Sequence, residues 1–232
     1  MKKIVVLTGA GMSAESGLST FRDAGGLWEQ YAVEDVATPE GYARNPELVI
    51  EFYNERRRQL ADVSPCRGHE LLAGLERDFK VTVITQNVDD LHERAGSTDV
   101  IHLHGELLKV TSSRNPDDPA CIRTLKPEEW CVKMGDKAAD GSQLRPYIVW
   151  FGEPVPAIGA AAAQVAEADV FVVIGTSLNV YPAAGLLAYV PAGVPVYVID
   201  PQPVRLPAGC RAVHLMKGAS EGMEELARLL KK

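Results

Sequence analysis

The sequence has few cysteines, no long apolar run and no excess of basic residues. Its four cysteines show no disulfide-framework spacing, so a reducing compartment is expected. No window approaches the length of a transmembrane helix, and the first apolar run is too short and too glycine-interrupted for a signal peptide. The net charge of −7 argues against a general nucleic-acid binder. We therefore expect a cytoplasmic protein with no membrane partner and no direct nucleic-acid partner.

Apolar residues make up 46% of the 232 residues, which predicts a packed globular core. Apolar strand-like runs alternate with helical stretches, which is typical of a parallel sheet with helices on both faces. The expected strands are 3–8, 80–85, 100–103, 147–151, 169–174, 194–199 and 212–215. The expected helices between them include 68–77, 156–168 and 220–232. The predicted fold class is α/β, with a Rossmann-like parallel sheet.

A glycine-rich turn directly follows the first expected strand. Gly9, Ala10 and Gly11 allow a tight turn and a close approach to a ligand, because glycine has no Cβ. Residues 13–17 can open a helix whose free N–H groups favour a phosphate. This arrangement is that of a dinucleotide-binding βα turn, although Gly9-x-Gly11-x-x-Ala14 alone matches the pattern weakly.

Two segments interrupt the alternation and are predicted to form a small inserted lobe. Residues 31–64 are charged and helical, with Pro39 and Pro46 near helix starts, and residues 111–146 are polar and irregular. The rest of the chain is assigned to the Rossmann-like, NAD-binding domain; it comprises residues 1–30, 65–110 and 147–232.

Polar loops follow other expected strands, at the sheet edge where ligands bind in such folds. Gln86, Asn87 and Asp89 follow one strand, and taken alone Asn87 or Asp89 would cap the helix 90–95. Residues 175–177 follow the strongest strand and fit an ordinary βα turn as well as a ligand edge.

Two histidines mark the strand that ends near residue 103. His104 precedes Gly105, and we interpret it as a general base because imidazole titrates near neutral pH and the glycine leaves room for a substrate. His102 is interpreted as structural. A metal pair is not favoured, because no acidic or cysteine residue has ligand spacing nearby.

The order of these segments is more informative than any one of them. The motifs GAGMSAESG, FRD, QNVD, HLHGE, VWFGE, GTS and VYPAAG occur in register over nearly the whole chain. In this they resemble the sirtuins, the NAD-dependent protein-lysine deacylases. The resemblance implies a Rossmann-like large domain with a small domain, NAD as the consumed co-substrate and acyl-lysine proteins as substrates. The implied products are free lysine, nicotinamide and 2′-O-acyl-ADP-ribose.

The resemblance also implies roles for single residues. His104 is the implied catalytic base, with Asn87 beside it. The implied NAD contacts are Gly9, Ala10, Gly11, Ser13, Ala14, Glu15, Gly17, Thr20, Phe21, Arg22, Trp28, Gln86, Asn87, Asp89, Gly175, Thr176, Ser177, Asp200, Gln202 and Ala219. Asp200 stands where asparagine is expected, but a carboxylate can still accept from a ribose hydroxyl. An extended substrate strand would be flanked by Val149, Phe151, Gly152, Leu178 and Val180.

Tyr53 and Arg56 indicate which acyl group is removed. They lie at i and i+3 of the expected helix 46–60 and therefore share a face. A guanidinium binds a carboxylate through two hydrogen bonds, and a tyrosine hydroxyl adds a third. With the small Ala37 upstream, the set resembles the bacterial class III branch, which removes succinyl and malonyl groups; deacetylation is expected to persist. The neighbouring arginines of this run, Arg57 or Arg58, are interpreted as solvated.

The zinc module that sirtuins usually carry is degenerate in this chain. Cysteines are absent just after His104, only Cys121 and Cys131 remain in the insertion, and it has no histidine. Structural zinc takes four nitrogen or sulfur ligands. The insertion's carboxylates are poor substitutes; they include Asp117, Asp118, Asp136 and Asp140. We predict no structural zinc and a lobe held by packing and hydrogen bonds.

Other functions remain open at this point. An NAD-dependent dehydrogenase would explain the glycine turn, but it needs an acidic residue on a second strand, where this chain has Phe-Arg-Asp and a helical insert. A non-catalytic NAD sensor would keep the glycines and lose the base, whereas His104 and Asn87 are present. Protein mono-ADP-ribosyl transfer uses the same NAD cleavage, and only product analysis separates it from deacylation.

Overall fold

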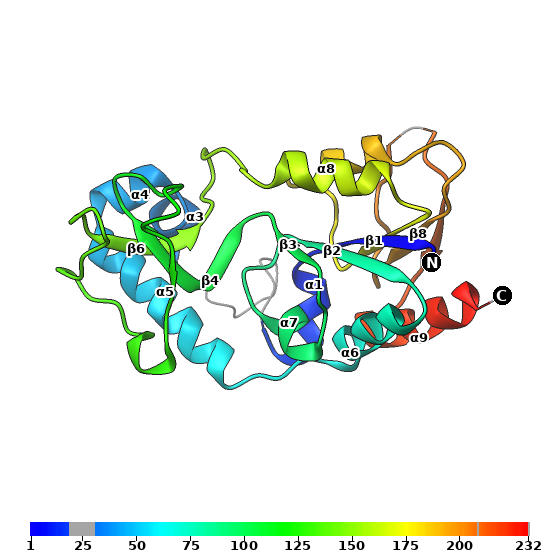
Figure 1. The fold of residues 1–232 in the computed structure, drawn as a ribbon, viewed down its shortest axis with the longest axis horizontal. Coiled ribbons are helices and arrows are strands. Elements are labelled where there is room, and N and C mark those ends of the chain that lie inside the picture. The colour runs from blue at the N-terminus through cyan, green and yellow to red at the C-terminus, as the bar shows by residue number, and fades with distance from the viewer. Residues whose placement is uncertain (19–30, 208, 232) are drawn as a thin grey trace.

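The computed structural model describes residues 1–18, 31–207 and 209–231. One part of the molecule is built on a parallel sheet of six strands in the order β3-β2-β1-β7-β8-β9, drawn in the right half of Figure 1. The strands are β1 (Lys3–Thr8), β2 (Lys80–Thr85), β3 (Val100–His102), β7 (Val170–Ile174), β8 (Val196–Ile199) and β9 (Ala212–Leu215). Each overlaps an apolar run singled out in the sequence, and the sheet confirms the Rossmann-like α/β fold class.

Both faces of this sheet are buried, because side chains of β1 alternate between separate cores. Ile4 and Val6 pack in a core with residues of α6 (Arg67–Gly74) and α9 (Ala219–Leu230). Val5 and Leu7 pack in the other core with residues of α8 (Ile158–Ala166) and the 3-10 helix η4 (Ala183–Tyr189). Shorter elements complete this part of the molecule; they are α1 (Ala10–Ser13), η1 (Ala14–Ser16), η2 (Leu75–Arg77) and α7 (Leu91–Ala95).

A second group of elements lies at the other end of the molecule (Figure 1). Its helices are α3 (Val33–Val36), α4 (Pro39–Arg44) and α5 (Pro46–Ala61). Pro39 and Pro46 occupy the starts of α4 and α5, as expected, and the side chains of Thr38 and Asn45 cap these helices. A three-stranded antiparallel sheet of order β5-β4-β6 packs with them; its strands are β4 (Gly105–Ser112), β5 (Arg123–Thr124) and β6 (Leu144–Ile148), and η3 (Pro127–Glu129) follows β5.

The strand expected at 147–151 is wrong in position and in sheet. β6 ends at Ile148 and pairs antiparallel with β4, and it takes no part in the parallel sheet. The strand β4 was not anticipated at all. A short apolar run shows that a segment is extended, but its partner is fixed by contacts that are distant in sequence. Within the described ranges, no helix is long and apolar enough to cross a bilayer.

Candidate functional site

The turn after β1 packs directly against the turn after β7. Gly9 N–H donates to the Ile174 carbonyl at 3.0 Å, and Gly11 N–H donates to the Gly175 carbonyl at 2.9 Å. A Cβ on Gly11 would lie 2.7 Å from the Cα of Gly175, so this approach of two backbones requires glycine. The sequence predicts a helix opening at 13–17; α1 instead begins at Ala10 and runs into η1, and Gly17 follows with a φ of 93°.

The end of β2 is tied to the β1 turn by a buried polar network. Asn87 Nδ2 donates to the Gly9 carbonyl and to Ser13 Oγ, both at 3.1 Å, and Ser13 Oγ donates to Asp89 Oδ2 at 3.0 Å. Asp89 Oδ1 also accepts from the Leu91 N–H at 3.2 Å, so this carboxylate caps the start of α7. Burial raises the pKa of Asp89. Residues from two separate motifs are therefore brought into one cluster.

Gln86 links this cluster to β7. Its Nε2 donates to Thr176 Oγ1 at 3.1 Å, and its N–H donates to the Thr8 carbonyl at 2.9 Å. The carboxyl ends of β1, β2 and β7 therefore meet at one edge, where NAD is predicted to bind.

His104 lies beside Gln86 and is half-buried. Its Nδ1 is 3.0 Å from the Gln86 carbonyl oxygen. A carbonyl can only accept, so Nδ1 carries the hydrogen and Nε2 keeps its lone pair in the neutral ring. Burial lowers the pKa of His104, which favours this neutral form.

The role that the sequence suggests for Gly105 needs correction. This glycine was expected to leave room for a substrate. Its φ is 83°, and a Cβ would lie 2.1 Å from the Tyr147 carbonyl oxygen. Gly105 therefore allows the backbone of β6 to pack closely against the start of β4, directly after His104.

His102 is engaged at both ring nitrogens. Nδ1 lies 3.1 Å from the Asn87 carbonyl, and Nε2 lies 2.7 Å from Glu93 Oε1. Both partners can accept, so the imidazolium form of the ring satisfies both contacts. Burial by itself would lower the pKa of His102, but the Glu93 carboxylate raises it above its ordinary value. These bonds agree with the structural role that the sequence indicates.

Several predicted cofactor residues lie at the edge of this cluster. Glu15 accepts from the Ser220 N–H at 3.1 Å and also bonds the Ser220 hydroxyl, so it ties η1 to the start of α9 beside the buried Ala219. Asp200 follows β8, and its Oδ1 accepts from the Gln202 N–H at 2.8 Å. Four other predicted cofactor contacts lie outside the described residues; they are Thr20, Phe21, Arg22 and Trp28.

The predicted substrate-flanking residues are partly exposed. Val149 N–H donates to the His104 carbonyl, and Phe151 N–H donates to the Ala37 carbonyl, both at 3.0 Å. The side chains of Phe151 and Val180 are exposed apolar groups. Gly152 is exposed, and Leu178 is half-buried against the core that contains Val5.

Ala37 and Tyr53 are both buried in one apolar cluster with Trp150, and Arg56 lies on the same helix as Tyr53. The Tyr53 hydroxyl accepts a hydrogen bond from Trp150 Nε1 at 3.1 Å. Arg56 is half-buried, with its Cζ 5.9 Å from the centroid of the Phe52 ring, and burial lowers its pKa. Trp150 belongs to the VWFGE motif, which is expected to flank the substrate, but the motif does not predict that the indole N–H contacts Tyr53.

The interpretation of the arginine run is right for Arg58 and wrong for Arg57. Arg58 is exposed and pairs with Glu51 at 2.6 Å and Glu55 at 2.8 Å. Arg57 is fully buried, with Nε donating to the Leu107 carbonyl at 2.8 Å. Burial lowers the pKa of Arg57 to about 10. Two oxygens accept from the buried guanidinium and offset part of its desolvation, the Leu107 carbonyl and Asn54 Oδ1.

The two cysteines of the insertion differ in environment. Cys121 is buried and its Sγ lies 3.7 Å from Asp118 Oδ2, whereas Cys131 is exposed and its Sγ lies 3.9 Å from Asn54 Nδ2. Among the residues described, no group of three or more histidine, cysteine and acidic side chains is placed to hold a metal ion. The absence of structural zinc stays a prediction.

Comparison with known proteins assigns the chain to a family. Residues 9–182 match the Sir2 family. This chain belongs to the Sir2 family. An "NAD-dependent protein deacylase" of Bacteroides thetaiotaomicron is 69% identical over 231 residues, which cover 99% of this chain and 98% of that protein.

Solved structures of the Sir2 family are similar along the whole chain. A Sir2 homologue in complex with NAD has a TM-score of 0.85 and 40% identity, covering 99% of this chain and 90% of the other. A Sir2 homologue variant in complex with 2′-O-acetyl ADP ribose has a TM-score of 0.83 and 40% identity, covering 99% and 92%. The resemblance of the sequence motifs to the sirtuins is thereby confirmed.

Proposed function

We propose that this Sir2-family chain is an NAD-dependent protein-lysine deacylase. The observation that carries the proposal is the setting of His104, whose Nδ1–H is held by the Gln86 carbonyl at the edge where β1, β2 and β7 end. The names of its relatives and the NAD complex of a similar structure support the same activity.

The residues at this edge fit NAD. The Gly9–Gly11 turn and Gly175 form a backbone surface that a side chain at Gly11 would disrupt, which suits a closely approaching pyrophosphate. Asn87, Ser13 and Asp89 provide buried, mutually bonded polar groups beside it. When bound, NAD supplies a ribose carbon that loses nicotinamide and accepts the acyl oxygen.

His104 is suited to take a proton in this reaction. Its neutral ring presents Nε2 as a base, because Nδ1–H is already donated. Its half-buried position limits water, and burial lowers its pKa, so the base is available at neutral pH. The Val149 N–H bonds the His104 carbonyl, so the base is also tied to the predicted substrate-flanking segment.

We further propose that acidic acyl groups, succinyl and malonyl, are preferred and that acetyl groups are also removed. Tyr53 and Arg56 share α5, and Ala37 packs in the same cluster as Tyr53. A tyrosine hydroxyl and a guanidinium together provide the donors that a terminal carboxylate requires. Ala37 adds little volume at that position.

Product analysis tests the activity. One peptide carrying acetyl-, malonyl- or succinyl-lysine is incubated with and without NAD, and the products are identified by mass spectrometry. We expect free lysine, nicotinamide and O-acyl-ADP-ribose only with NAD. His104→Ala should lower turnover by about 10²–10⁴-fold at saturating NAD. Wild-type turnover in that variant would refute the role of His104, and ADP-ribose on the protein without deacylation would indicate mono-ADP-ribosyl transfer.

The acyl preference is tested by comparing neighbouring arginines. Arg56→Met should lower kcat/KM for desuccinylation by about ten- to a hundredfold, because a hydrogen bond to a charged group contributes about 1.5–3 kcal/mol. Deacetylation should fall much less, since it has no carboxylate to lose. Arg58→Met is the matched control, because Arg58 is exposed and bonded to Glu51 and Glu55. Equal losses on both substrates in Arg56→Met would show that Arg56 does not read the acyl group.

A further inference from the structure

The polarity of the Trp150–Tyr53 hydrogen bond limits what Tyr53 can do. An indole N–H can only donate, so Tyr53 Oη is the acceptor in this 3.1 Å bond. The two residues are 2% and 3% exposed, so water does not compete. The described residues offer no acceptor for the Tyr53 hydroxyl hydrogen. The hydroxyl hydrogen of Tyr53 therefore remains available for donation.

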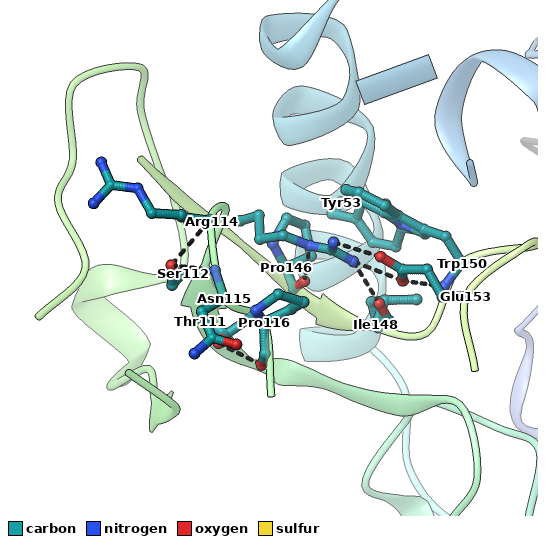
Figure 2. Close-up of polar contacts among 11 residues, drawn as sticks. Tyr53, Thr111, Ser112, Arg114, Asn115, Pro116, Pro146, Ile148, Trp150 and Glu153 are labelled. Carbon is teal, nitrogen blue, oxygen red and sulfur yellow. Dashed lines mark hydrogen bonds and ion pairs between the residues drawn. The ribbon is translucent and has the colours of Figure 1, made fainter. Parts of the chain in front are cut away.

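A buried ion pair between Arg145 and Glu153 lies against Trp150. Figure 2 shows Glu153 beside Trp150 and Tyr53. Arg145 of β6 binds Glu153 through two hydrogen bonds of 2.8 and 3.0 Å. The Arg145 guanidinium carbon lies 3.4 Å from the centroid of the Trp150 ring. Glu153 Oε2 also accepts from the backbone N–H of Trp150 at 2.8 Å. Both the ring and the backbone of Trp150 are therefore fixed by the same pair.

The Arg145–Glu153 pair lies buried beside Trp150, with side chains 5% and 18% exposed. A buried ion pair is a poor source of net stability compared with apolar side chains of the same volume. Arg145 also donates to the Ile148 carbonyl at 2.8 Å, so the pair fixes the end of β6 as well as Trp150. The only polar side-chain atom of Trp150 contacts the hydroxyl of Tyr53, which shares α5 with Arg56. A hydroxyl that could rotate freely would present either a lone pair or a hydrogen to a ligand. The indole N–H of Trp150 occupies one lone pair of Tyr53 Oη and therefore favours orientations in which the hydroxyl hydrogen points away from Trp150.

We propose that Trp150 is a positioning residue for acyl-group selection, acting by orienting the Tyr53 hydroxyl as a donor toward the acyl carboxylate, and that Arg145 and Glu153 hold Trp150 for this purpose. The proposal rests on the proposed preference for acidic acyl groups. A carboxylate only accepts hydrogen bonds, so a pre-oriented donor favours it over a methyl group. Substrate binding then requires less ordering of the site.

The test is a double-mutant cycle with Trp150→Phe and Tyr53→Phe. kcat/KM is measured at saturating NAD on one peptide with succinyl- or acetyl-lysine. Trp150→Phe keeps an aromatic ring for Arg145 but removes the indole N–H that Tyr53 accepts. We expect it to lower the succinyl-to-acetyl ratio by about three- to tenfold, mainly through KM for the succinyl peptide. In the Tyr53→Phe background, the same change should leave the ratio unaltered.

Each other outcome is decisive. An equal loss on both substrates, or an undiminished loss of ratio in the Tyr53→Phe background, would overturn the positioning role. If Tyr53→Phe alone leaves the ratio unchanged, the acidic-acyl preference itself fails at Tyr53, and this inference fails with it.

Glu153→Gln keeps the question answerable if Trp150→Phe does not fold. The glutamine retains a side-chain oxygen for the backbone N–H of Trp150, and it removes the negative charge that pairs with Arg145. We expect the succinyl-to-acetyl ratio to fall about two- to threefold, again only when Tyr53 is present. An unchanged ratio in folded Glu153→Gln, shown by an unaltered circular dichroism spectrum, would overturn the role of the ion pair.

Discussion

Replacing Gly11 with alanine should separate the turns at which β1 and β7 end. Gly11 does not have a left-handed backbone, so alanine is allowed there by conformation and the conflict is purely steric. The new Cβ would lie 2.7 Å from Gly175 Cα and 3.0 Å from the Gly175 carbonyl oxygen. Carbon atoms in contact are normally about 3.5 Å apart or more, so the turns must separate by roughly 0.8 Å. Both neighbours are backbone atoms and cannot rotate away.

This displacement should reduce both stability and NAD use. Overpacking of this kind costs about 1–3 kcal/mol. For a chain of this size, 1 kcal/mol lowers the Tm by about 2–4 °C, so a fall of about 2–12 °C is expected. A shift near 1 Å at a reacting site can cost on the order of 10²-fold, so kcat/KM for NAD should fall about ten- to a hundredfold.

The assay combines thermal unfolding with initial rates at varied NAD. Gly159→Ala in α8 is the matched control, because Gly159 is exposed and a Cβ there meets no atom within 4 Å. That variant should be more stable by about 0.5–1 kcal/mol and unchanged toward NAD. A Gly11→Ala protein with wild-type Tm and wild-type kcat/KM for NAD would refute the reasoning.

Arg57→Met should lower the free energy of unfolding by about 1–3 kcal/mol in urea titration, because the Leu107 carbonyl loses its buried donor; a change below about 0.5 kcal/mol would contradict this. Stability should also fall as the pH drops from about 6.5 toward 4: burial lowers the pKa of His69 to about 4, so the unfolded chain binds a proton in that window that the folded chain does not. His69→Gln should weaken this dependence, and an identical pH profile would exclude His69 as its source. Finally, protein purified without chelator should contain no stoichiometric zinc by elemental analysis; one zinc per chain would point to Cys121 and Cys131 with carboxylate ligands.

The parallel sheet could be predicted because its strands are continuous apolar runs that end in glycine or polar loops. The site edge followed from the same pattern, since parallel strands place their carboxyl ends together; Asn87 and Ser13 do meet there. The strand at 147–151 failed because pairing with β4 is a long-range property. Its partner strand mixes polar and apolar residues and gave no local signal.

Arg57 shows a second limit of sequence reasoning. In a run of three arginines on a helix, adjacent side chains are predicted to face different directions, but the run does not predict which side chain faces the core. That depends on the Leu107 carbonyl, which β4 places against α5. The contact of Trp150 with Tyr53 could not be predicted for a related reason, because it depends on how the VWFGE segment packs against α5.

The position of β1 in the sheet has a consequence for synthesis of the chain. β1 pairs with β2, beginning at Lys80, and with β7, beginning at Val170, so its neighbours are made long after it. At about 5–20 residues per second, β1 has no sheet partner for several seconds, and its second edge stays open for roughly twice as long. A nascent chain halted before β7 would present an apolar strand edge and could not close the glycine contact between residues 11 and 175. β1 is therefore made well before both of its neighbours and is among the last segments to reach its final environment.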